Sequence, residues 1–203
     1  MEDRVKRTME SLLKNNITAS YFEDSNEAIN YFLNQIKNNS TVGIGGSMTV
    51  MSLEIPQKLI ARGNKVAFHW LENSAEKMDE ARTLASKSDV YLTSTNALTE
   101  KGQLVNIDGV GNRVAAMIYG PKKVYIICGV NKITSDFDSA VERIKSNAYK
   151  NARRLKLNTP CAMNEKCVDC CSPERMCNVM AVIDKKPSKT QMEVIIINDE
   201  LGF

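Results

Sequence analysis

The strongest constraint on the fold is an alternation of short, continuously apolar segments with longer segments that have helical spacing. The run VIII at residues 194–197, for example, has no polar residue. Strands covered on both faces have this composition, whereas strands with one face in solvent alternate apolar and polar residues. Because alternating strands and helices form mostly parallel sheets, we predict an α/β fold with helices flanking such a sheet. The predicted strands cover residues 41–46, 65–70, 89–95, 103–108, 123–129 and 192–198.

Four of the intervening segments have the apolar spacing of amphipathic helices. Asp24 or Ser25 can cap the first and Ser135 the last, because these side chains accept hydrogen bonds from the free N–H groups of a first turn. Pro56 is expected to divide the second helix in two. The four segments are residues 24–37, 47–62, 74–86 and about 135–155.

Two stretches depart from this alternation. Lys101 and Gly102 lie in a short loop between two strand patterns, which predicts an inserted hairpin. Residues 156–191 are rich in cysteine and proline and lack apolar periodicity, which predicts a small irregular lobe. We therefore expect residues 1–155 to form an α/β domain. Residues 156–203 should form a cysteine-rich, metal-binding lobe and a final strand, packed on the same domain.

The composition argues against several classes of protein. With 43% hydrophobic and 25% charged residues, the 203-residue chain has the composition of a globular domain, not of a disordered chain. A net charge of +3 is too small to imply nucleic-acid binding. The first residues lack the apolar core of a signal peptide, and no apolar run has the length of a membrane span. We therefore expect a cytoplasmic protein with reduced thiols and with neither a nucleic acid nor a membrane as partner.

A glycine-rich loop, GIGGS, follows the strand predicted at 41–46 and precedes a helix. Gly43, Gly45 and Gly46 permit a tight turn whose N–H groups, with Ser47, could bind a phosphate or a carboxylate. The loop matches neither the dinucleotide-binding pattern nor the P-loop pattern. A tight strand-to-helix turn without a ligand explains it equally well.

A second glycine-rich loop follows the strand that ends at Asp108. Gly109 and Gly111 form the turn, and a short helix should begin at Asn112 and Arg113. A cation at a helix start is unusual, because the helix dipole there favours anions. Arg113 could hold an anionic ligand or form a salt bridge with Asp108, and the sequence favours neither.

Two more loops should reach the same edge of the sheet, since the carboxyl ends of parallel strands lie together and ligand sites collect there. Asn131 and Lys132 follow the strand at 123–129, and Asn96 follows the strand at 89–95. We therefore expect a small anionic ligand at this edge. Asp108 and Lys132 are the candidates for catalytic proton transfer.

The segments GIGGSMTV and NALTEKGQLVNIDGVGNRVAAMIYGPKKVYIICGVNKI resemble the LUD (lactate-utilisation) domain family, which includes stand-alone lactate-utilisation protein C. The resemblance covers most of residues 1–155. It implies the fold shared by ribose-5-phosphate isomerase, glucosamine-6-phosphate deaminase and CoA transferases. It also implies a role beside iron–sulfur partner subunits that oxidise L-lactate to pyruvate. It supplies no catalytic residue, and the glutamate nucleophile of CoA transferases cannot be placed here by motif.

Five of the six cysteines lie between residues 161 and 177, with the spacing C-x5-C-x2-C-C-x5-C. A C-x2-C pair can bind one metal ion from a single turn, and flanking cysteines can complete four ligands. Sites made only of thiolates select zinc or iron–sulfur clusters. Reduced thiols without a metal are the alternative. Nearby basic residues could offset the negative charge of such a site, namely Arg153, Arg154, Lys156, Lys166 and Arg175.

Cys161, Cys167, Cys170 and Cys177 are the ligands we predict, and Cys171 points elsewhere because it adjoins Cys170. A similar C…C-x-x-C…SP-x-R-x-C-N tail in relatives of the LUD domain supports this choice by resemblance. The same resemblance favours a 4Fe–4S cluster over zinc, because the family works beside redox partners.

Three functions follow from these features. The favoured one is a subunit or accessory factor of an iron–sulfur system for L-lactate oxidation. The second is an independent enzyme acting on a phosphosugar, an acyl-CoA or a folate-like anion, with a structural metal. The third is a non-catalytic assembly module. Whether the chain is an enzyme by itself stays open, as does assembly into a homo-oligomer.

Overall fold

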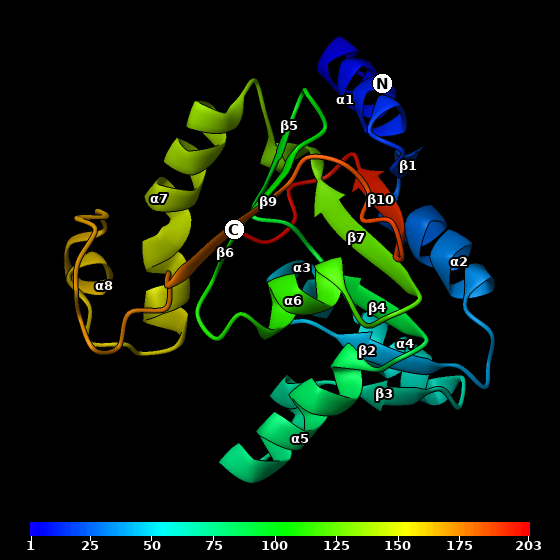
Figure 1. The fold of residues 1–203 in the computed structure, drawn as a ribbon, viewed down its shortest axis with the longest axis horizontal. Coiled ribbons are helices and arrows are strands. Elements are labelled where there is room, and N and C mark those ends of the chain that lie inside the picture. Colours follow the sequence, from blue (N-terminus) through cyan, green and yellow to red (C-terminus); the bar gives the residue numbers. More distant parts are fainter.

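The computed structural model describes residues 1–203 and contains two β-sheets (Figure 1). The larger sheet has six strands in the order β1-β10-β7-β4-β2-β3, and every neighbouring pair is parallel. This confirms the predicted α/β fold with a mostly parallel sheet. The strands are β1 (Thr18–Phe22), β2 (Thr41–Ile44), β3 (Lys65–Ala67), β4 (Val90–Thr93), β7 (Lys123–Gly129) and β10 (Gln191–Ile197).

The smaller sheet has four strands in the order β8-β5-β6-β9. β5 and β6 are antiparallel and form the predicted hairpin, whose turn contains Gly102 with φ +79°. β9 pairs with β6, so the hairpin belongs to a sheet that the sequence did not predict. Its strands are β5 (Ala97–Thr99), β6 (Leu104–Asp108), β8 (Ile133–Thr134) and β9 (Val179–Ile183).

Helices cover both faces of the six-stranded sheet. Ile126 of β7 packs into a core with residues of α1, α5 and α6, whereas Ile127 packs on the other face with residues of α2, α3 and α4. Burial of consecutive residues on opposite faces accounts for the unbroken apolar runs. The helices are α1 (Asp3–Lys14), α2 (Ser25–Gln35), α3 (Met48–Ser52), α4 (Ile55–Ala61), α5 (Ala75–Ser86) and α6 (Asn112–Ile118).

The helix ends follow the capping residues of the sequence, with one exception. Asp24 accepts hydrogen bonds from two backbone N–H groups of α2. The segment at 47–62 is divided as predicted, and Pro56 lies in the first turn of its second helix. The prediction that Ser135 caps the last long helix is wrong. Asp136 accepts the hydrogen bond from the Ser139 N–H at 2.9 Å, because the helix begins at Phe137.

The long helix α7 (Phe137–Arg154) packs against the smaller sheet and leads into an irregular region (Figure 1). This region, residues 156–178, is called the cysteine segment below. It contains one short helix, α8 (Pro160–Asn164), and only Thr159 is buried in it. Two 3₁₀ turns complete the fold, η1 (His69–Leu71) and η2 (Val130–Lys132). None of the helices combines the length and apolarity needed to cross a bilayer.

Candidate functional site

A cleft of about 370 Å³ opens at the carboxyl edge of the six-stranded sheet. Its walls come from the segments that follow β2, β3, β4 and β7, and from the loop that follows β6. Arg82 of α5 and Arg154 of α7 complete it from the sides. The cleft therefore lies where the topology of an open parallel sheet favours ligand binding.

The structure brings eight of the twelve predicted ligand-binding residues together in this cleft. They come from all four predicted loops, and Lys132 is the contribution of the loop after β7. The eight are Gly46, Ser47, Asn96, Asp108, Gly109, Asn112, Arg113 and Lys132.

The other four predicted residues, Gly43, Gly45, Gly111 and Asn131, do not line the cleft. A Cβ at Gly43 would lie 2.4 Å from a backbone oxygen of α5, and one at Gly45 would lie 2.7 Å from the Tyr91 hydroxyl. Gly111 has φ +91° and precedes α6. The Asn131 side chain accepts a hydrogen bond from a backbone N–H near the end of the chain. The three glycines therefore permit close packing or a turn, and Asn131 contacts the last residues of the chain.

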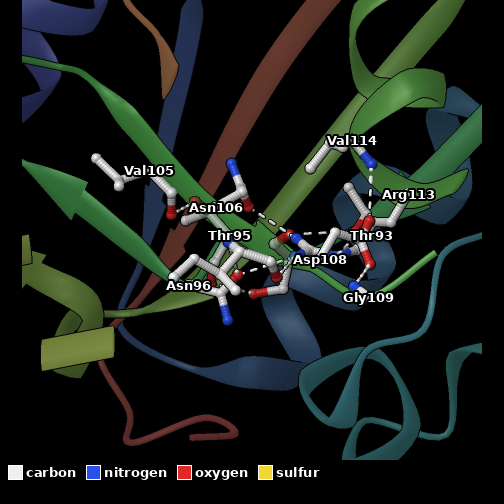
Figure 2. A network of polar contacts seen from close by, with 11 residues as sticks. Thr93, Thr95, Asn96, Val105, Asn106, Asp108, Gly109, Arg113 and Val114 are labelled. Carbon is white, nitrogen blue, oxygen red and sulfur yellow. Dashed lines mark hydrogen bonds and ion pairs between the residues drawn. The ribbon is translucent and has the colours of Figure 1, made fainter. Parts of the chain in front are cut away.

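Arg113 links the loops after β4 and β6 (Figure 2). Its guanidinium is buried, and this burial lowers its pKa from the ordinary value. It donates hydrogen bonds to four oxygen atoms at 2.7 to 3.1 Å. Because its guanidinium is engaged in these four hydrogen bonds, Arg113 positions the walls of the cleft. The acceptors are the carbonyls of Ser94 and Ile107 and the side-chain oxygens of Asn96 and Asn106.

Asp108 is also held by its surroundings. One carboxylate oxygen accepts from the Val114 N–H at 3.1 Å and lies 3.9 Å from Nε of Arg113. The other accepts from the Gly109 N–H at 3.0 Å. Of the two interpretations of Arg113, the structure thus shows the salt bridge. Both oxygens of Asp108 are engaged in fixing the first turn of α6.

Lys132 differs from Arg113, because no carboxylate lies within 4 Å of its ammonium group. Its Nζ donates to the hydroxyls of Thr49 at 3.0 Å and Ser94 at 2.9 Å, and the residue is 4% exposed. Burial, together with the charges of nearby arginines, lowers the pKa of Lys132 to about 7. A buried amine with this pKa is partly neutral at physiological pH.

Some side chains that line the cleft were not predicted as ligand-binding, and four of them bear on its chemistry. The guanidinium of Arg154 lies 4.5 Å from the centre of the Trp70 ring. Burial and nearby Arg82 lower the pKa of His69 to about 4, so its ring is neutral at pH 7. The Nε atom of Arg82 is buried without a hydrogen-bond partner. No local motif distinguishes these residues, because they come from η1, α5 and α7 and not from a glycine-rich loop.

The charges around the cleft are unequal. Four basic side chains line it, of which Lys132 is partly neutral, and Asp108 is the single acidic side chain. Arg113 is paired with Asp108, and Arg82 with Asp79. Arg154 has no carboxylate partner, so the cleft presents a modest excess of positive charge. This arrangement is suited to a small anion. The four basic side chains are Arg82, Arg113, Lys132 and Arg154.

The cysteine segment contains five free thiols. Burial raises the pKa of Cys177, and the thiols of Cys167 and Cys170 are close enough to raise it further. Arg175 donates hydrogen bonds to the carbonyls of Cys170 and Cys177. The Cys161 sulfur lies 3.3 Å from the Thr159 hydroxyl. No group of three or more metal-ligating side chains in the structure is arranged to hold a metal ion.

The cysteine segment is tied to the wall of the cleft. The Asn178 N–H donates to the Asp108 carbonyl at 3.0 Å, and its side chain donates to the Gly109 carbonyl at 3.2 Å. Met176 lines the cleft, and Cys177 lines a smaller adjoining cavity of about 50 Å³. Residues 176–178 therefore connect the thiols with the loop after β6.

Comparison with other proteins agrees with this architecture. No curated protein matches the chain. The crystal structure of a DUF162 family protein from Deinococcus radiodurans is similar, with a TM-score of 0.55 over 96% of each chain. At 10% sequence identity, this likeness shows a shared fold only. The family model of the LUD domain matches residues 5–197, which includes both sheets and the cysteine segment. The chain therefore belongs to the LUD-domain family.

Proposed function

We propose that the chain is a subunit or accessory factor of an iron–sulfur system that oxidises L-lactate to pyruvate, and that its cleft binds a small organic anion. Membership of the LUD-domain family relates the chain to lactate utilisation. The observation that carries the proposal is the charge of the cleft. Its one acidic side chain, Asp108, is already paired with Arg113, and the guanidinium of Arg154 has no carboxylate partner.

Size and donor chemistry support a small carboxylate as the ligand. A cleft of about 370 Å³ has the volume of a small-molecule site. Guanidinium groups bind carboxylates through two parallel hydrogen bonds, and those of Arg82 and Arg154 lie in its walls. Lactate and pyruvate each carry one carboxylate beside an oxygen that Lys132 or a hydroxyl could contact.

We further propose that the cysteine segment binds a thiolate-ligated metal centre, with a 4Fe–4S cluster favoured over zinc. The support is the C-x2-C spacing and the proximity of three thiols, Cys167, Cys170 and Cys177. The four cysteines would have to move together around the metal, because no three of them are arranged to hold an ion here. Such movement is common, because metal sites often assemble only as the metal binds. A centre there would adjoin the cleft through Met176.

Calorimetric titration with L-lactate and with pyruvate tests the cleft. Binding should weaken about 10- to 100-fold in Arg154→Gln, since a hydrogen bond to a charged group contributes about 1.5–3 kcal/mol. Lys58→Gln is the control, because this exposed lysine lies outside the cleft and pairs with Glu54. Equal affinities of the two variants, or no binding of either acid to the wild-type chain, would contradict the proposed ligand.

Anaerobic purification followed by a visible spectrum and iron and sulfide analysis tests the metal centre. We expect a brown protein whose iron is lost in Cys167→Ser. Cys171→Ser is the matched control and should keep its iron, because Cys171 is not among the four predicted ligands. Stoichiometric zinc without iron would rule out a role in electron transfer.

A second candidate function is supported by Lys132. Enzymes commonly place a lysine of lowered pKa in a ligand-binding cleft, and Lys132 lies in such a position. The chain could then act independently on an anionic substrate, such as a phosphosugar, an acyl-CoA or a folate-like anion. Unchanged turnover of every such substrate by Lys132→Met would exclude this function.

A further inference from the structure

We propose that Lys132 is a nucleophile, and that its amine forms an imine with the carbonyl carbon of a small 2-oxo acid bound in the cleft. This inference rests on the proposed function, because it requires that the cleft binds small organic anions. It goes further by assigning a covalent role to one residue.

The hydrogen bonds around Lys132 fix which protons are available. The Thr49 hydroxyl donates its own proton to the Leu201 carbonyl at 3.3 Å. The Ser94 hydroxyl donates its proton to the Thr95 carbonyl at 3.3 Å. Both hydroxyls therefore present lone pairs to Nζ of Lys132 and accept from it. Nζ has two acceptors and no third partner.

Two acceptors match a neutral amine better than an ammonium group. An ammonium has three N–H donors, so one would be buried without an acceptor, which is costly. A neutral amine has two N–H groups, and both would be satisfied. Its lone pair would then remain free of protein contacts. Because Lys132 lines the cleft, this lone pair is available to a bound molecule.

The charged groups around Lys132 act in the same direction. Arg113 of α6 and Arg143 of α7 lie close enough to disfavour a third cation. The Cys128 thiol of β7 is the other titratable group nearby, and burial raises its pKa to about 11, so it carries no charge at pH 7. Desolvation and neighbouring cations are the two means by which enzymes activate lysine nucleophiles.

The other walls of the cleft favour a substrate that is also an acid. Arg82 lies in the wall of the cleft with its Nε–H buried without an acceptor, and its guanidinium pairs with Asp79. Arg154, whose guanidinium lies over Trp70, supplies a second donor group. A 2-oxo acid joins a carboxylate to a carbonyl, so one molecule can meet both the guanidinium groups and the amine.

The reaction balances without an oxidant or another reactant. The lone pair of Nζ attacks the carbonyl carbon, a C–N bond forms, and the π electrons move to the oxygen. The Ser94 or Thr49 hydroxyl can relay a proton from the nitrogen to this oxygen, because each contacts Nζ. Loss of water from the carbinolamine then gives the imine.

Reductive trapping tests the proposal. The full chain is incubated with pyruvate and cyanoborohydride, and the product is analysed by intact mass and peptide mapping. We expect one reductively attached carboxyethyl group per chain, located on Lys132. L-Lactate, which has no carbonyl group that an amine can attack, should give no adduct. Lys132→Arg should lose the adduct, and Lys122→Arg, which changes an exposed lysine, should keep it.

The outcomes separate this inference from the proposed function. The trapping is repeated with glyoxylate and 2-oxobutyrate. If all three acids modified surface lysines and left Lys132 unmodified, the proposal that Lys132 is a nucleophile would be wrong. If L-lactate still bound by calorimetry, the anion-binding cleft would stand. An adduct on Lys132 without measurable binding of L-lactate would support the nucleophile and count against lactate as ligand. Mapping of the wild-type chain decides the question even if Lys132→Arg fails to fold.

Discussion

The six-stranded sheet and the cysteine segment are stabilised in opposite ways. In the sheet, β10 buries every residue from Met192 to Ile197, and helices cover both faces. In the cysteine segment only Thr159 is buried, and polar contacts such as those of Arg153 and Arg175 hold the chain. Burial of apolar surface is the dominant stabilising term in folding.

This difference shows how the molecule divides its tasks. The sheet can form from the hydrophobic pattern alone, and it gives the cleft rigid walls. The cysteine segment lacks a core of its own, so its conformation depends on contacts with α7 and on what the thiols bind. Four experiments can test or refine this contrast.

The largest effect is expected from removing Arg113. Arg113→Met leaves Asp108 without its cation and several buried oxygens without a donor, so the free energy of unfolding should fall by about 3–5 kcal/mol. Arg175→Met, which removes an arginine of the cysteine segment, should lower the free energy of unfolding far less, because its ion pair with Asp169 is exposed to solvent. Urea unfolding measures both. Similar losses in the two variants would contradict the contrast.

A pair of apolar truncations compares packing directly. Ile195 is fully buried in β10, whereas Val168 of the cysteine segment is 56% exposed. Ile195→Ala should lower the free energy of unfolding by about 2–5 kcal/mol, since it leaves a cavity. Val168→Ala should change it by no more than about 0.5 kcal/mol. If Val168→Ala lowered the free energy of unfolding by more than about 1.4 kcal/mol, the cysteine segment would be packed more tightly than the exposure of Val168 indicates.

The free energy of unfolding should depend on pH through Lys132. The pKa of this residue is about 7 in the folded chain, below its ordinary value of 10.5. Between these values the unfolded chain binds a proton that the folded chain lacks. The contribution of Lys132 to stability should therefore rise from about pH 7 to about pH 10.5, by at most about 1.4 kcal/mol per pH unit. Thermal unfolding of Lys132→Met should lack this component. An identical slope in the variant would show that other groups cause it.

The smallest effect on global stability is expected at Arg153. This exposed residue donates to the Ala162 carbonyl of α8 at 2.7 Å and pairs with Glu165. Arg153→Gln should change the free energy of unfolding by less than about 0.5 kcal/mol. Trypsin should nevertheless cut the cysteine segment faster than in wild type. Lys58→Gln is the control, and equal cleavage rates would show that this contact does not restrain the segment.

The sequence predicted those strands whose residues are apolar and consecutive. β7 and β10 are clear because both of their faces are buried. β1 was missed because its side chains are only partly buried, so it has no apolar run. β9 was missed because cysteines and prolines surround it and Met180 and Val182 are exposed. The order of the strands depends on pairing between distant residues, which local patterns do not contain.

The sequence predicted the part of the cleft that follows glycine-rich turns. Asp108 ends β6 of the smaller sheet and Lys132 follows β7 of the larger sheet, and both line the cleft. Arg82 and Arg154 were not predicted for the cleft because they belong to helices whose charges resemble an ordinary solvent face. Gly43 was predicted as a ligand but permits close packing of α5 on β2. Residue type alone does not distinguish a residue that lines the cleft from one that permits packing or faces solvent.

The central position of β10 has a consequence for biosynthesis. β10 is translated after every other strand, yet it lies between β1 and β7. Until residues 191–197 leave the ribosome, β1 has no neighbour in the sheet and one edge of β7 stays open. Open edges recruit strands from other chains, so the chain should need protection at these edges until β10 pairs. The cysteines precede β10 in the sequence and therefore leave the ribosome before the sheet can close.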